Sequence, residues 1–186
     1  MISNYYFVWN KKLSHEICQK LINLGKGNWE QAETEKPVDN VRKSDIVWTN
    51  EQWIYDLIWP YMFAANERTG RKYNMVANEG CQVTEGCQVT RYTKDGYHSW
   101  HKDHGSLDSK LVHGNVRKLS MSVILNSNFE GGDFEIAGLN DENKIPKLEE
   151  GSIIVFPSFM THRVTPITKG IKYSLIVVWF LRPSFR

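Results

Sequence analysis

The chain has 186 residues, of which 41% are hydrophobic and 12% aromatic, a composition typical of a globular protein with a packed core. The formal net charge of +2 is small, which argues against nucleic acid or an anionic membrane as the main partner. No run approaches the ~18 consecutive apolar residues of a membrane span, and the opening residues lack the basic segment of a signal peptide. The three cysteines have no C-x-x-C spacing, so we expect a reducing, cytoplasmic setting.

The first part of the chain is predicted to be helical. Ser14 can cap a helix that ends near Gly25, because apolar residues recur after it with a 3.6-residue period. A polar stretch at 29–40 is predicted to be a loop, and residues 46–48 a short strand. A second helix is expected over 52–68, with Pro60 inside it. The residues expected on its buried side are Trp53, Leu57, Ile58, Tyr61, Met62 and Ala65.

From about residue 80 the pattern changes to short apolar runs separated by Gly, Pro and Asn. We expect strands at 87–92, 100–103, 118–126, 133–136, 152–156 and 173–181, a spacing that favours a sandwich or jelly roll. The last of these is apolar on both faces, which predicts a second sheet on one side and a covering layer on the other. The N-terminal helices could form that layer. The expected fold is mainly β with flanking N-terminal helices (α+β), in one domain over 1–186. Residues 1–78 would support a β core over 79–186.

A perfect tandem hexapeptide, Glu-Gly-Cys-Gln-Val-Thr, occupies residues 79–84 and 85–90. Six is an even number, so either copy could supply a strand with the same residues facing inward. The second copy runs directly into Arg91 and Tyr92, and the strand is therefore predicted there.

The pair His101 and Asp103 is the first candidate for metal binding. On a strand, residues two apart point to the same face, although a histidine beside an aspartate is also common on surfaces. His162 follows a predicted buried strand that ends at Pro157, and returning strands could bring it alongside the pair. Two imidazoles and one carboxylate form a facial triad that leaves positions open on Fe(II), whereas a structural zinc site is closed by four ligands.

Lys172 and Ser174 share one face of the last predicted strand. A lysine on an apolar strand is costly unless an anion pairs with it, and the distal carboxylate of a dicarboxylic acid is such an anion. The alternative is a lysine at the strand end whose ammonium group reaches water.

The run over residues 88–179 resembles the catalytic core of the prolyl 4-hydroxylase-like branch of the 2-oxoglutarate/Fe(II) dioxygenases, of bacterial or phage type. The match covers about half of the chain, and the ordered set of motifs is more specific than any single piece. The matching pieces are Arg91-Tyr92 with Gly96, His101-x-Asp103, Arg117-x-x-Ser120 leading to Leu125-Asn126, Gly131-Gly132-Asp133-Phe134, Gly151-x-x-x-x-Phe156-Pro157, His162-Arg163-Val164-x-Pro166-Ile167 and Gly170-x-Lys172-Tyr173-Ser174.

This resemblance implies a double-stranded β-helix, a cupin-like jelly roll, with Fe(II) held by His101, Asp103 and His162. It also implies that Lys172 pairs with the C5 carboxylate of 2-oxoglutarate. In the same comparison Tyr92 hydrogen-bonds that carboxylate and Ser174 assists.

The resemblance leaves the substrate contacts less defined. Many relatives have a tyrosine three residues before the first metal histidine, where this chain has His98, with Tyr97 one step earlier. His98 and Tyr97 are therefore candidate substrate contacts. Arg117 is a further candidate substrate contact, and a surface salt bridge is an equally probable role for it.

The implied activity is hydroxylation of proline in a peptide or protein, with 2-oxoglutarate and O₂ consumed, succinate and CO₂ released, and ascorbate as a candidate reductant. One alternative is the same reaction on a free amino acid or small metabolite. Another is a non-catalytic, cupin-like metal-binding protein, which would have no use for a dicarboxylate clamp. The cytoplasm expected above would be that of a host cell if the chain is phage-encoded.

Overall fold

The computed structural model describes residues 6–32, 41–68, 84–103, 116–138 and 145–181. Its helices are α1 (His15–Asn23) and α2 (Gln52–Arg68). Its strands are β1 (Phe7–Trp9), β2 (Glu30–Gln31), β3 (Arg42–Lys43), β4 (Asp45–Thr49), β5 (Thr84–Tyr92), β6 (Tyr97–His101), β7 (Val116–Ile124), β8 (Phe129–Gly131), β9 (Phe134–Ile136), β10 (Ile153–Pro157), β11 (His162–Val164), β12 (Ile167–Gly170) and β13 (Lys172–Leu181).

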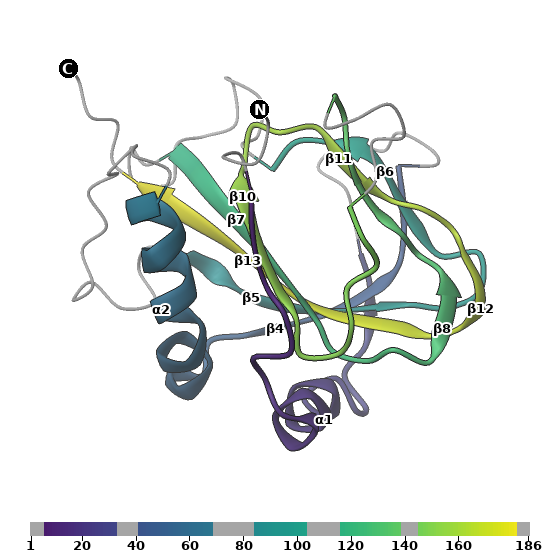
Figure 1. Ribbon diagram of the computed structural model, residues 1–186. Helices are drawn as coiled ribbons and strands as arrows, with labels where there is room; N and C mark the ends of the chain where they lie inside the picture. Colours follow the sequence, from purple (N-terminus) through teal and green to yellow (C-terminus); the bar gives the residue numbers. More distant parts are fainter. Residues whose placement is uncertain (1–5, 33–40, 69–83, 104–115, 139–144, 182–186) are drawn as a thin grey trace.

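Two antiparallel sheets form the body of the protein, as predicted for a jelly roll. The larger has seven strands in the order β1-β10-β7-β13-β5-β4-β2, and the smaller has the order β3-β6-β11-β9. Figure 1 shows β6 and β11 on one side of the larger sheet and both helices away from them. The N-terminal part adds β1, β2 and β4 to the larger sheet and β3 to the smaller one, so it supplies strands as well as helices.

Both predicted helices are confirmed, but the buried side of α2 differs from the prediction. The Ser14 hydroxyl caps α1 by accepting from the backbone N–H of Ile17. In α2, Ile58, Met62 and Ala65 are buried as expected, whereas Trp53, Leu57 and Tyr61 are only partly buried. Ile54, Tyr55 and Asn66 are buried in their place. Because α2 is apolar around most of its circumference, its periodicity does not fix which side faces the sheet.

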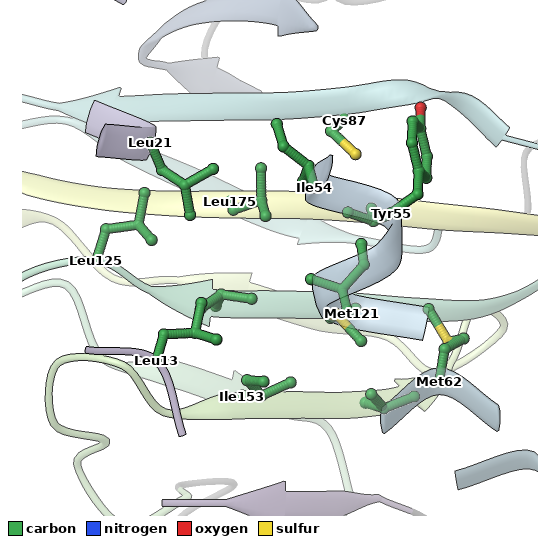
Figure 2. Close-up of a cluster of buried hydrophobic side chains, with 14 of the residues drawn as sticks. Leu13, Leu21, Ile54, Tyr55, Met62, Cys87, Met121, Leu125, Ile153 and Leu175 are labelled. Carbon is green, nitrogen blue, oxygen red and sulfur yellow. The ribbon is translucent and has the colours of Figure 1, made fainter. Parts of the chain in front are cut away.

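The main hydrophobic core lies between the helices and the outer face of the larger sheet. Figure 2 shows Leu21 from α1 and Ile54 from α2 beside Leu175, Cys87 and Met121 from the strands. The two faces of β13 therefore have different surroundings, as predicted. Leu175 and Val177 pack in this core, whereas Lys172, Ser174, Ile176 and Val178 line a cavity on the other face.

The predicted strands are present with small shifts, and one shift affects the metal-site prediction. The second copy of the hexapeptide lies within β5, as expected, and residues 79–83 of the first copy lie outside the described residues. The strand predicted to reach Asp103 ends at His101, so Asp103 lies in the following turn rather than on the strand. Strands β1, β2, β3, β8, β11 and β12 were not predicted. Among the described helices, none is long and apolar enough to cross a membrane.

Candidate functional site

A cavity of about 390 Å³ lies between the two sheets, within the size range of small-molecule sites. One wall is the inner face of β4, β5, β7 and β13, and the opposite wall comes from β6, β9 and β11. The cavity contains the candidate metal ligands His101, Asp103 and His162 together with Tyr92, Lys172 and Ser174. Residues from strands far apart in the sequence thus meet in one cavity.

The three candidate metal ligands converge as the sequence predicted. His101 ends β6 and His162 begins β11, and the two are paired across these strands. One ligand atom from each of the three residues lies within 4.8 Å of the others. The Asp103 carboxylate is 3.5 Å from Nε2 of His101 and 3.6 Å from Nε2 of His162. Neighbouring ligands of a six-coordinate ion lie roughly 3 Å apart, so this spacing fits one ferrous ion.

The backbone fixes the orientation of both imidazoles. Nδ1 of His101 is 2.8 Å from the carbonyl oxygen of Ser99, and Nδ1 of His162 is 2.9 Å from that of Met160. A carbonyl oxygen can only accept, so Nδ1 must carry the proton in each ring. The Nε2 lone pairs therefore face Asp103, the arrangement that metal-binding histidines adopt.

Two hydrogen bonds fix the backbone of Asp103. Its backbone N–H donates to the carbonyl oxygen of Ser158 at 3.0 Å, and Arg117 donates to its carbonyl oxygen at 3.1 Å. Burial favours the neutral acid, but the interactions of its carboxylate with His101 and His162 hold the pKa of Asp103 below its ordinary value. The candidate ligand is therefore anionic at neutral pH. Its position depends on these turn contacts, because it is not on the strand.

Lys172 is 3% exposed and sits on the cavity wall where β13 begins. Its Nζ donates to the carbonyl oxygen of Gly132 at 2.7 Å. Burial lowers the pKa of Lys172 to about 8, and the nearby Asp133 opposes this shift. Tyr92 lies directly across from Lys172 on β5, and Ser174 follows on the same face of β13. Burial raises the pKa of Tyr92, so its hydroxyl stays protonated and can donate to an anion.

The three candidate substrate contacts lie differently. The ring of His98 stacks on that of His101 with centroids 3.4 Å apart, and burial keeps the pKa of His98 far below its ordinary value. Arg117 lines the cavity and contacts the backbone of Asp103. Tyr97, the first residue of β6, is outside the set of residues that line the cavity.

Arg42 also lines the cavity and was not identified from the sequence. It belongs to β3, a two-residue strand in a polar stretch without periodicity, and only the pairing of β3 with β6 brings it to the site. The aromatic rings of Phe134 and Phe156 pack against His162, with centroids 5.4 and 4.7 Å away. They give the candidate metal site an apolar lining on that side.

Comparisons with known proteins agree with this geometry. Residues 87–181 match the family model described as the 2OG-Fe(II) oxygenase superfamily. A PKHD-type hydroxylase from Gloeothece citriformis is 34% identical over 97 residues, which are 52% of this chain and 42% of that protein. The match thus spans less than half of that relative's length.

Two solved structures are similar over nearly the whole chain. The viral collagen prolyl hydroxylase of Paramecium Bursaria Chlorella virus-1, in its 2OG complex, has a TM-score of 0.70 and 22% identity, covering 96% of each chain. A Trichoplax adhaerens prolyl hydroxylase, in complex with a hypoxia inducible factor peptide fragment, has a TM-score of 0.65 and 19% identity, covering 96% of this chain and 84% of that one. At these identities the likeness shows the fold, a double-stranded β-helix.

Proposed function

Because this chain belongs to the 2OG-Fe(II) oxygenase superfamily, we propose that it hydroxylates proline in a peptide or protein, at the cavity between the two sheets. Iron(II), 2-oxoglutarate and O₂ are the reactants that this family implies. The observation that carries the proposal is the presence, in one cavity, of an open His-Asp-His triad and a buried lysine. A metal-storage protein would need the first but would have no use for the second.

Each residue has a distinct role in the proposed reaction. When bound, Fe(II) with 2-oxoglutarate and O₂ supplies the oxidising chemistry, which converts the co-substrate to succinate and CO₂ and adds one oxygen atom to a C–H bond. Asp103 and the Nε2 atoms of the two histidines would hold the ion. Their opposite nitrogens donate to backbone carbonyls and keep the rings in register.

The other end of the cavity would bind the co-substrate. The Lys172 ammonium group would pair with the far carboxylate of 2-oxoglutarate, and the hydroxyls of Tyr92 and Ser174 would donate to it. All three are at most 3% exposed, so water would compete little with these bonds. Phe134 and Phe156 would keep water from the metal side. Residues 1–78 would act as support for the core over 79–186, within one domain.

The similar proteins support proline in a peptide as the substrate. One similar structure is of a collagen prolyl hydroxylase and another holds a peptide fragment, although both are distant in sequence. A cavity of about 390 Å³ has room for a ring-sized side chain beside a five-carbon diacid. A free amino acid or small metabolite is the alternative substrate.

The test has two stages. Under anaerobic conditions, adding 2-oxoglutarate to the Fe(II) protein should produce a metal-to-ligand charge-transfer band. With air, ascorbate and a proline-rich peptide, succinate should form and the peptide should gain the mass of one oxygen atom, whereas a matched peptide with alanine for proline should not. Asp103→Ala should abolish both signals, and the exposed Lys169→Gln should change neither. Turnover with free amino acids and none with any peptide would reject the peptide substrate.

A further inference from the structure

Arg42 bridges the two sheets along one side of the cavity. Its backbone is in β3 of the smaller sheet, where it pairs with His98. Its side chain reaches β5 of the larger sheet, where one guanidinium nitrogen donates to Oε1 of Gln88 at 2.8 Å and to Oγ1 of Thr90 at 3.4 Å. Another nitrogen of the group donates to Oγ of Ser44 at 2.7 Å. These bonds hold the guanidinium group in a fixed orientation against the cavity.

The contacts of Arg42 differ from those of Arg91 and Arg163, which do not line the cavity. Arg91 and Arg163 each pair with a carboxylate, from Asp45 at 2.8 Å and Glu135 at 2.7 Å. Within the described part of the chain, the hydrogen-bond partners of Arg42 are neutral, and no carboxylate pairs with it. A partly buried guanidinium group without a counter-ion is costly, and its rigid fork suits a carboxylate. The missing anion can come from a ligand.

The charges around the cavity indicate which ligand supplies it. Among the described residues, its lining contains four cationic side chains, from Arg42, Lys102, Arg117 and Lys172, and one carboxylate, from Asp103. A ferrous ion and the 2-oxoglutarate dianion cancel each other's charge. The loaded cavity would therefore remain positive, and 2-oxoglutarate already has Lys172 and the metal for its two carboxylates. The remaining ligand is the molecule to be hydroxylated.

We propose that Arg42 binds a carboxylate on the substrate and thereby makes the enzyme selective for acidic substrates. This inference rests on the proposed function and narrows its substrate class. Trp48 lies beside this position, because it pairs with Gln88 across β4 and β5 and lines the same cavity. Its side chain is 49% exposed, which leaves an aromatic surface for the apolar part of the substrate. The carboxylate can belong to an acidic residue near the target proline or to a free amino acid.

Paired peptides that differ only in charge provide the test. Proline peptides with glutamate or glutamine at each position next to the proline are compared by kcat/KM, in the wild type and in Arg42→Gln. The wild type should prefer glutamate at one position by about tenfold or more, since a charge-assisted bond is being compared with a neutral one. The preference should fall to about one in Arg42→Gln and be partly restored in Arg42→Lys. Lys169→Gln, which removes one exposed positive charge outside the cavity, should retain the full preference.

Binding of 2-oxoglutarate, measured by the anaerobic charge-transfer band, gives a second readout. Its affinity should change little in Arg42→Gln. A glutamate preference that is absent in the wild type, or unchanged in Arg42→Gln, would overturn the inference even if proline peptides are hydroxylated. So would an Arg42→Gln variant whose only defect is weak 2-oxoglutarate binding, because Arg42 would then belong to the co-substrate site.

Failure of the proposed function gives a different result. If no proline peptide is turned over, free proline and prolinamide, which lacks the carboxylate, are added to the anaerobic Fe(II)·2-oxoglutarate protein. A shift of the charge-transfer band with proline alone, lost in Arg42→Gln, would reject the peptide substrate and support carboxylate binding by Arg42. Equal effects of the two compounds would reject both proposals.

Discussion

Replacing Lys172 by methionine should stabilise the ligand-free protein. The buried ammonium group has its pKa lowered from 10.5 to about 8, so the folded protein holds this proton more weakly than the unfolded chain does. Protonated Lys172 therefore costs the fold about 3 kcal/mol below pH 8, a cost that disappears as the pH rises through 10.5. Methionine has a similar volume, but it leaves the Gly132 carbonyl without its donor, at about 1 kcal/mol. The net gain is about 2 kcal/mol, or roughly 4–8 °C in Tm.

The same replacement should remove most of the affinity for 2-oxoglutarate. A carboxylate buried opposite methionine loses its counter-ion, which costs about 3–5 kcal/mol and raises Kd more than about 100-fold. Chemical denaturation of the metal-free protein gives the stability, and anaerobic titration of the Fe(II) protein gives Kd. Stability and affinity should thus move in opposite directions.

Lys169→Met is the matched control, because Lys169 is exposed and forms a surface ion pair with Glu130. It should change the free energy of unfolding by about 0.5 kcal/mol or less and leave Kd unaltered. The reasoning would be refuted if Lys172→Met destabilised the ligand-free protein more than Lys169→Met does. A Kd of Lys172→Met for 2-oxoglutarate within about threefold of the wild-type value would refute the assigned role of Lys172.

Three further results are expected. Above pH 8 the affinity for 2-oxoglutarate should fall about tenfold per pH unit as Lys172 loses its proton, and a Kd independent of pH in this range would contradict that role. Asp103→Ala should weaken Mn(II) binding by about 100-fold or more, as measured by the EPR signal of the free ion. Retained binding would show that Asp103 is not a metal ligand. Gly151→Ala should lower the free energy of unfolding in urea by about 2 kcal/mol more than Gly138→Ala does. Both glycines have positive φ, but only at Gly151 would a Cβ lie against the Leu13 carbonyl oxygen. Equal losses of stability would show that this contact relaxes.

Much of the fold follows from local sequence patterns. The helix capped by Ser14, the strand containing the second hexapeptide and the two-faced strand β13 were all predicted from the spacing of apolar residues. These features depend on the 3.6- and two-residue periods of helix and strand, which each segment carries without its neighbours. The short strands β3, β11 and β12 have too few residues to show a period, and they were missed for that reason.

The candidate metal ligands could be named from the sequence because the ordered set of motifs around them is specific, although the His101 and Asp103 pair alone is not. Their geometry could not be predicted. The predicted strand alternation of His101 and Asp103 does not occur, and turn contacts to Ser158 and Arg117 orient the aspartate instead. Arg42 gave no signal at all. It reaches the cavity because β3 pairs with β6 and its side chain crosses to β5, more than 40 residues away.

Local spacing thus determined the helices and the long strands, and the ordered set of motifs determined the choice of candidate ligands. The tertiary structure decided which side of α2 is buried, how Asp103 is aimed and that Arg42 joins the cavity. The physical reason is that these features depend on which distant strands pair and how the two sheets face each other. Such pairings are set by the packing of the whole chain, and no short segment encodes them.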